Sequence, residues 1–219
     1  MEVDESVLAG PPLGRDPRLW PALVANARPS LRLAAGPGRS WLGGEPVTAP
    51  GFAWPHTPDG RPLTFLAGIV IDELFGGTAL NVFYDLDGFE PVWHLHLAPA
   101  PDGPPATGRP HGVTRVLTVP ERWEAPVHAL WQAGPADASQ VYRRLARRTA
   151  DGPVHRVLGW SDPLQGPMHE DGWTLLLQLD SDPATGFTFG DEGTVYFWIP
   201  DEDLRAAELS RVRAVVQSH

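Results

Sequence analysis

The sequence predicts an α+β fold, in which a large, mainly antiparallel mixed sheet is built from two pseudo-repeated halves and accompanied by few short helices. Of the 219 residues, 42% are hydrophobic, which is enough for a substantial core. The chain contains 23 Gly and 25 Pro, and these residues favour turns over long helices. Short apolar segments with strand-like patterns recur along its whole length.

The N-terminal region is expected to be a loose leader over residues 1–15, followed by a single domain over residues 16–219. A short helix opens this domain. In DPRLWPALVANAR, Asp16 suits the N-cap and Pro17 the first helical position, so we expect the helix to run from there to about Arg28.

Strand patterns dominate the middle of the chain. Ser30–Ala35 alternates as a strand does, and Leu63–Asp72 is a continuous apolar run typical of a strand buried on both faces. Between them, residues 36–62 are rich in Gly and Pro and predict an ordered loop, and a second Pro-rich surface loop is expected over residues 99–112. Further strands are expected at Ala79–Asp85, Pro91–Ala98 and Val113–Val119.

The last third of the chain repeats this mixture. SQVYRRLARRTADG, from Ser139 to Gly152, has the cap, apolar stripe and terminator of a helix. The strands expected after it are Trp173–Asp180, Thr194–Ile199 and a closing strand within residues 210–218, and a short helical turn is expected over residues 200–209.

Charge and composition exclude several classes of function. The formal net charge is −10, which repels nucleic acid and anionic lipid and attracts a basic protein. The chain has no Cys, which excludes disulfides and thiol catalysis. Its acidic N-terminus is unlike a signal peptide and no apolar run is long enough to span a membrane, so we expect a cytoplasmic protein.

The two halves of the chain echo each other. RPLTFLAGIVID followed by GGTALNVFYD is matched by DGWTLLLQLDSD followed by DEGTVYFWIP. The pseudo-repeats span about residues 40–98 and 155–217. If they share an origin, two similar strand pairs surround an approximate two-fold axis, with a cleft where the halves meet.

The motifs SWLGGEP, FAWPHTPDGRPLTFLAGI, HRVLGWSDPLQG, WTLLLQLDSD and GDEGTVYFWIPDEDL resemble the YwqG-like family of bacterial proteins, a domain of unknown function. The resemblance covers about residues 30–217. It implies a single cytosolic α+β domain without an established activity, and candidate immunity proteins encoded beside toxin genes occur in such families. The first strand departs from the family pattern at Gly68 and Val70, where Gln and Asp are expected, whereas the second copy keeps Gln178 and Asp180.

Acidic residues surround the turn in LDSDPATGFTFGDEGTVYFW. Ala184 and Thr185 stand where an EF-hand needs an oxygen ligand and a Gly, which excludes that motif. Pro183 and the glycines predict a solvated turn. A weaker alternative is a cation site made by the acidic residues Asp180, Asp182, Asp191 and Glu192. We therefore expect no metal and no cofactor.

Histidines offer a second metal hypothesis. WHLHL places His94 and His96 on one face of a strand, a spacing that serves zinc when a third ligand converges. His111 and His155 are candidates for that third ligand. The alternative, which the missing HExxH motif favours, is a pair of partly exposed strand histidines.

A groove between the halves is the candidate site for a ligand or a partner. Nine tryptophans fill the core or, alternatively, recognise a bound group. The candidate groove residues are Trp54, Trp160, Gln165, Gln178, Asp180 and Asp182.

The favoured function is a non-enzymatic, protein-binding module of the immunity or regulatory type, whose acidic surface meets a basic protein. The alternative is a hydrolase or a small-ligand-binding enzyme that uses the cleft, with a cation assisting. A deep pocket with converging acids or histidines would favour the alternative, and a flat acidic face would favour the binding module.

Overall fold

A computed structural model describes residues 2–3, 18–88, 90–133 and 152–219. Its described residues form a ten-stranded sheet and four short helices, which confirms the α+β class. Every strand pairing among these residues is antiparallel. No described helix is both long enough and apolar enough to cross a bilayer.

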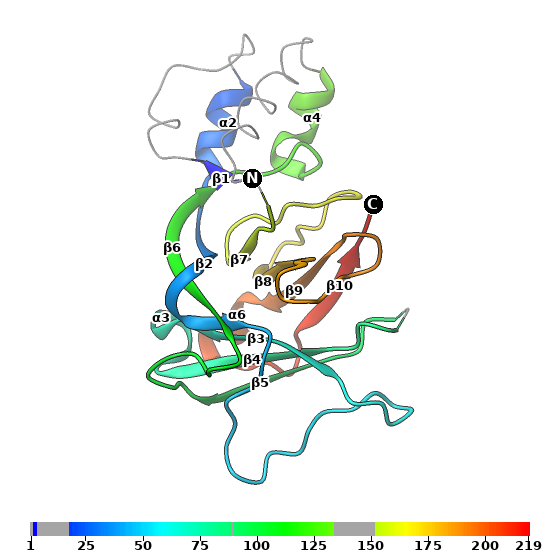
Figure 1. The fold of residues 1–219 in the computed structure, drawn as a ribbon. Coiled ribbons are helices and arrows are strands. Elements are labelled where there is room, and N and C mark those ends of the chain that lie inside the picture. The colour runs from blue at the N-terminus through cyan, green and yellow to red at the C-terminus, as the bar shows by residue number, and fades with distance from the viewer. Residues whose placement is uncertain (1, 4–17, 89, 134–151) are drawn as a thin grey trace.

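The main path of the sheet follows the order β10-β9-β8-β7-β2-β3-β4-β5, and β6 pairs with both β1 and β2 (Figure 1). The strands are β1 (Glu2–Val3), β2 (Arg28–Leu42), β3 (Thr64–Val70), β4 (Thr78–Tyr84), β5 (Trp93–Pro99), β6 (Arg109–Thr118), β7 (His155–Val157), β8 (Trp173–Asp180), β9 (Thr194–Pro200) and β10 (Arg213–Gln217). Long β2 is the central strand, with β6 on one side and both β7 and β3 on the other.

The sheet has two three-stranded arms, β3-β4-β5 and β8-β9-β10, which pack face to face. Tyr84 of β4 lies edge-on against Phe189, and Trp93 of β5 lies edge-on against Phe197 of β9, with ring centroids 5.5 and 6.1 Å apart. The largest hydrophobic cluster takes buried residues from both arms. The molecule therefore has a shared core between the arms.

The outer face of each arm has a cover of its own. The outer face of β3-β4-β5 is covered by a cluster that contains Phe65 of β3, Phe83 of β4 and Trp41 of β2. Phe52, from the loop before β3, packs against it. Strand β3 is thus buried on both faces, as predicted from its unbroken apolar run. On the other arm, Tyr196 and Trp198 belong to a cluster that includes Met168 of the loop before β8.

Four helices in the described part of the chain accompany the sheet. They are α2 (Leu19–Ala25), α3 (Asp72–Phe75), α4 (Ala125–Ala133) and α6 (Asp201–Ala206). Helices α2 and α4 lie side by side beyond the end of β6 (Figure 1), where Leu23, Val119 and Val127 form a small core. The predicted helix Ser139–Gly152 falls on residues 134–151, outside the described residues, except for its last residue.

The first helix is shorter than predicted, because α2 ends at Ala25 and Arg28, the expected end of the helix, already begins β2. Asp16 and Pro17 lie outside the described residues, and α2 is described from Leu19, with Arg18 at the N-cap and no side-chain cap. The leader contains β1, whose Glu2 and Val3 pair with the end of β6. Residue 1 and residues 4–15 of that leader are not among the described residues.

The predicted loops are shorter than expected because strands extend into them. Strand β2 continues through Gly36 and Pro37 to Leu42, and its register against β6 shifts between Ala35 and Ser40. The bulge accommodates residues that a regular ladder would not. Strand β6 begins inside the predicted loop 99–112, and Pro110 is tolerated because no described strand pairs with the opposite edge of β6 at that point.

Candidate functional site

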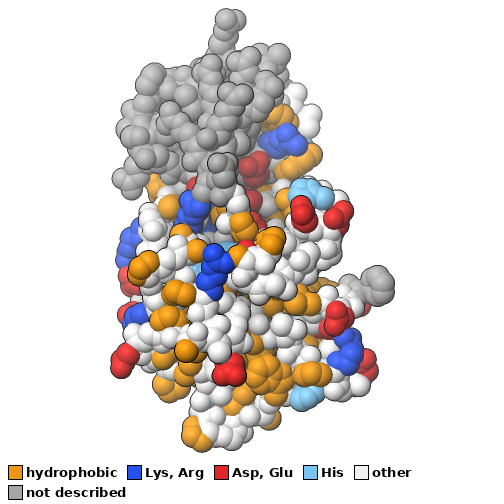
Figure 2. Space-filling model, viewed as in Figure 1, with side chains coloured by type: hydrophobic (Ala, Val, Ile, Leu, Met, Phe, Trp, Pro, Cys, Tyr) orange, Lys and Arg blue, Asp and Glu red, His pale blue; other side chains and the backbone are white. Residues whose placement is uncertain are grey.

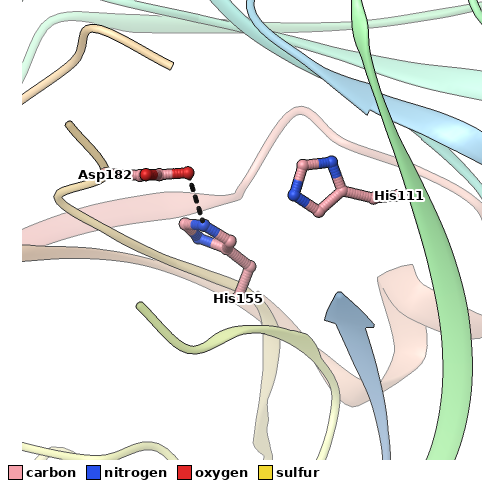
Figure 3. Close-up of side chains that lie close together, drawn as sticks. All are labelled: His111, His155 and Asp182. Carbon is pink, nitrogen blue, oxygen red and sulfur yellow. Dashed lines mark ion pairs between the residues drawn. The ribbon is translucent and has the colours of Figure 1, made fainter. Parts of the chain in front are cut away.

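A cavity of about 300 Å³ lies where β2, β6, β7 and the hairpin after β8 meet. Its polar lining comes from Arg32 on β2, Arg109 and His111 on β6, His155 on β7 and Asp182 in the hairpin. Three of these side chains, from His111, His155 and Asp182, are buried and point toward one another (Figure 3). Their candidate ligand atoms all lie within 4.8 Å of one another.

The bulge in β2 sets the position of His111. A Cβ atom on Gly38 would overlap the carbonyl oxygen of His111, and one on Gly112 would lie 2.8 Å from the carbonyl oxygen of Pro37. Only glycines allow the two strands to approach this closely. The motif GPGR, expected to be part of a loop, is therefore a β-bulge beside the cavity, a common way to aim a side chain at a site.

The ring of His111 is held in one orientation. Its Nδ1 lies 2.9 Å from the carbonyl oxygen of Arg109, and a carbonyl can only accept, so Nδ1 carries the proton. The other ring nitrogen, Nε2, is therefore unprotonated and has a lone pair to offer to a group in the cavity. Burial lowers the pKa of His111, which keeps the ring neutral.

His155 is held the opposite way. The backbone N–H of Asp180 donates to its Nδ1 at 3.3 Å, so the proton of the neutral ring is on Nε2. That Nε2 is buried and has no hydrogen-bond partner among the described residues; the nearest carboxylate oxygen, Oδ2 of Asp182, is 3.6 Å away. Burial, with a smaller effect from His111, lowers the pKa of His155 to about 4.

Asp182 reaches the cavity from the turn that the sequence predicted. Its Oδ1 accepts the backbone N–H of Ala184 at 2.9 Å, and its carbonyl accepts the N–H groups of Thr185 and Gly186. These bonds fix the carboxylate while leaving Oδ2 directed at His155. The turn is confirmed, and Asp182 is a buried residue of a cluster rather than part of a solvated turn.

Charge in the cavity is mixed. Arg32 pairs with Glu2 at 3.4 Å, and its Nε is buried without a hydrogen-bond partner among the described residues. Arg109 has no ion-pair partner in the described part of the chain, and its charge acts to lower the pKa of His111. An unpaired guanidinium beside a cavity attracts an anion.

Of the predicted groove residues, Gln178 and Asp180 belong to a structural network next to the cavity. Asp180 accepts the N–H of Val154 at 2.7 Å, the hydroxyl of Thr194 at 2.9 Å and the amide of Gln178 at 3.2 Å. Gln178 also accepts the N–H of Asp162 at 3.0 Å. Their polar atoms are bonded within the protein, so they hold β7 and β8 together rather than face a ligand.

The other three predicted groove residues lie apart from the cavity. Trp160 is buried, donates its indole N–H to the carbonyl of Asn26 and lies under the guanidinium of Arg28, 3.9 Å from the ring centroid. Gln165 is exposed and donates to the carbonyl of Ser218. Trp54 packs edge-on against Phe83 on the outer face of β3-β4-β5. Only Asp182 of the six lines the cavity.

Neither predicted metal grouping forms in the described part of the chain. Asp191 and Glu192 are exposed and do not join Asp180 and Asp182 in a cluster. His94 and His96 stack on β5 beside Phe52, and none of the described residues joins them as a third ligand. The two candidate third ligands, His111 and His155, instead pair with each other and with Asp182.

The sequence gives only part of the information needed to predict the cluster of His111, His155 and Asp182. His111 directly precedes Gly112, and HRVLGW places His155 at the start of a short strand, but no spacing rule joins residues 44 positions apart. Their meeting depends on β2, which pairs with β6 along one edge and with β7 along the other.

A second pocket of about 230 Å³ lies on the outer face of β8-β9-β10. Its walls include Trp173, Trp198 and Met168, and the guanidinium of Arg213 lies over the Trp173 ring at 3.9 Å. It brings no cluster of histidines and acids together. Its chemistry is that of a shallow aromatic groove.

A family model described as a domain of unknown function (DUF1963) matches residues 105–217, just over half of the chain. The chain belongs to the DUF1963 family. The match includes β6 to β10, and with them His111, His155 and Asp182, whereas the arm β3-β4-β5 lies outside it. The expectation of a domain of unknown function is confirmed. No curated protein matches the sequence.

Proposed function

We propose that this DUF1963 protein binds a small anionic molecule in the cavity lined by His111, His155 and Asp182, and that hydrolase-type acid–base chemistry is the activity this site would support. One observation carries the proposal. The Nε2–H of His155 is buried in the cavity wall without an acceptor from the described residues. A buried donor of this kind costs free energy unless a water or a ligand accepts from it.

The remaining groups define the ligand. His111 offers a lone pair and His155 an N–H donor on facing rings, so one oxygen atom between them can accept from His155 while a proton passes to His111 or Asp182. Arg109 and Arg32 supply positive charge at the same cavity. A carboxylate or a phosphate ester of small size has the required oxygen atoms and charge.

The test uses inorganic phosphate and acetate as probes. NMR titration should shift the ring signals of His111 and His155, and Arg109→Gln should weaken that binding at least fivefold. Arg115→Gln is the matched control, because Arg115 is on the same strand, is exposed and pairs with Glu73. The proposal would be contradicted if the ring signals of His111 and His155 did not change on addition of either phosphate or acetate.

A protein-binding role of the immunity or regulatory type stays a second proposal, with a basic protein as the partner. The net charge of −10 supports it. On the face seen in Figure 2, however, acidic side chains are interspersed with Arg rather than gathered into one patch. A YwqG-like identity and a cytoplasmic location are also proposed, on the motifs given above.

We also propose that the arms β3-β4-β5 and β8-β9-β10 are copies of one ancestral unit. They occupy opposite ends of the main path of the sheet in mirrored order. The ladder of each first strand pair shifts register at the equivalent place, between Phe65 and Ala67 and between Leu175 and Leu177. The short helices break the equivalence, since α3 follows β3 and α6 follows β9.

A further inference from the structure

We propose that His111, His155 and Asp182 form a binding site for one divalent transition-metal ion, with zinc as the best match. The inference rests on the proposed function, because it names a component of the same cavity. It goes beyond that function, since an anion can bind the cavity with or without a metal.

The donor set favours a transition metal over calcium or magnesium. Two imidazole nitrogens and one carboxylate oxygen suit zinc, whereas calcium and magnesium prefer oxygen ligands alone. Around a tetrahedral zinc with bonds of about 2.0–2.1 Å, ligand atoms are about 3.4 Å apart. The separation of 3.6 Å between Nε2 of His155 and Oδ2 of Asp182 is already close to this value.

Hydrogen bonds to backbone groups orient two of the proposed ligands, His111 and Asp182, so that each has one atom free to bind a metal. The Nδ1–H of His111 donates to the carbonyl of Arg109, which turns the lone pair of Nε2 inward. Oδ1 of Asp182 accepts the N–H of Ala184, which leaves Oδ2 for the ion. Both arrangements exist before any ion enters.

His155 must change tautomer to become a ligand. Its Nε2 carries the proton while the N–H of Asp180 donates to Nδ1. Coordination through Nε2 moves that proton to Nδ1, so the proton count of the ring is unchanged; the bond from the N–H of Asp180, 3.3 Å long, is lost, and that amide must turn away because two N–H donors would otherwise face each other. Metal binding should therefore be visible at the backbone amide of Asp180.

Three protein ligands leave a fourth position open toward the cavity. Zinc sites with this ligand count bind water or substrate at the open position, in contrast to closed structural sites. Arg109 and Arg32 line the same cavity and carry the charge that would hold an anionic group beside the ion.

The test is calorimetric titration of the chelator-treated full chain with zinc chloride. We expect one ion per chain with a Kd in the micromolar range or tighter, and no comparable heat with calcium or magnesium chloride. His111→Gln and Asp182→Asn should each weaken zinc binding at least tenfold. His94→Gln is the control, because it removes a histidine from a strand outside the cavity. Absent binding, or binding that both cavity variants retain, would overturn the proposal.

A second measurement on the unaltered chain covers the case in which a cavity variant fails to fold. Zinc should shift the amide signal of Asp180 and move the ring proton of His155 from Nε2 to Nδ1, as ring nitrogen shifts report. Unchanged signals at saturating zinc would overturn the metal site. If phosphate or acetate still shifts the rings, the metal site alone is wrong and the proposed function stands.

Discussion

Gly68 lies beneath the indole ring of Trp41, and this contact leaves no room for a side chain at that position of β3. A Cβ atom at Gly68 would overlap the six-membered part of that ring. Trp41 is fully buried and pairs with Gly68 across β2 and β3. Under the proposed duplication, the corresponding register pair would be Arg156 opposite Gln178, where both residues are polar.

Gly68→Ala should therefore lower the free energy of unfolding by about 1–3 kcal/mol, because the added methyl group overpacks a rigid ring. Chemical denaturation measures the change. Gly103→Ala is the control, since nothing lies within 4 Å of a Cβ at that position. Equal stability of the two variants would show that Trp41 does not occupy the space above Gly68.

Arg156 is a fully buried cation whose charge is balanced by Asp162. Burial by itself raises the pKa of Asp162, but the charge of the Arg156 guanidinium and further favourable contacts, among them one with Gln178, together outweigh that effect and the pKa falls to about 2. A carboxyl group with a lowered pKa stabilises the fold above its unfolded pKa and loses that contribution as the pH falls through its folded value.

Asp162→Asn should cost about 2 kcal/mol at pH 7, less than the roughly 3–5 kcal/mol of a fully buried broken pair, because 31% of the Asp162 side chain is still exposed. The difference from the parent protein should shrink between pH 4 and pH 2. Urea unfolding at several pH values measures it, with exposed Asp102→Asn as the control. A difference that persists unchanged at pH 2 would contradict the ion pair.

At the scale of elements, the bulge in β2 is the feature that assembles the cavity. Gly38→Ala would push β6 away at the His111 carbonyl. We expect weaker zinc or phosphate binding by at least tenfold together with lower stability, measured by calorimetry and by denaturation. Retained affinity with lower stability would mean that His111 keeps its place without the bulge.

The strands of both arms could be predicted from sequence because their apolar patterns are local. Trp173–Asp180 was expected with the bounds that β8 has, and Leu63–Asp72 contains β3. The continuation of β2 through GPGR could not be predicted, since Gly and Pro favour a loop until a neighbouring strand is there to accept the bulge. Strand β7 was missed because its three residues are too few to show a period.

The candidate site was less predictable than the fold for the same reason. Asp182 was named as a groove residue and His111 and His155 as metal ligands, but in separate hypotheses. Their joint position depends on long-range pairing of β2 with β6 and β7. Local sequence rules describe neither that pairing nor the depth at which it buries the rings.

At the scale of the whole molecule, net charge predicts how any protein partner associates. With a formal charge of −10, association with a basic protein should slow about tenfold or more between low and physiological ionic strength. Stopped-flow measurements on a captured partner would check this. An association rate that does not change with salt would show that the acidic surface does not steer the partner. The cavity would then be the remaining candidate for the functional site.

The most direct test of the cavity as the functional site is a high-resolution crystal structure of the protein grown with zinc and phosphate. We predict density that belongs to neither protein nor bulk solvent within bonding distance of Nε2 of His155, with His111 and Asp182 around it. A collapsed cavity, or a protein atom that accepts a hydrogen bond from that Nε2, would contradict the account.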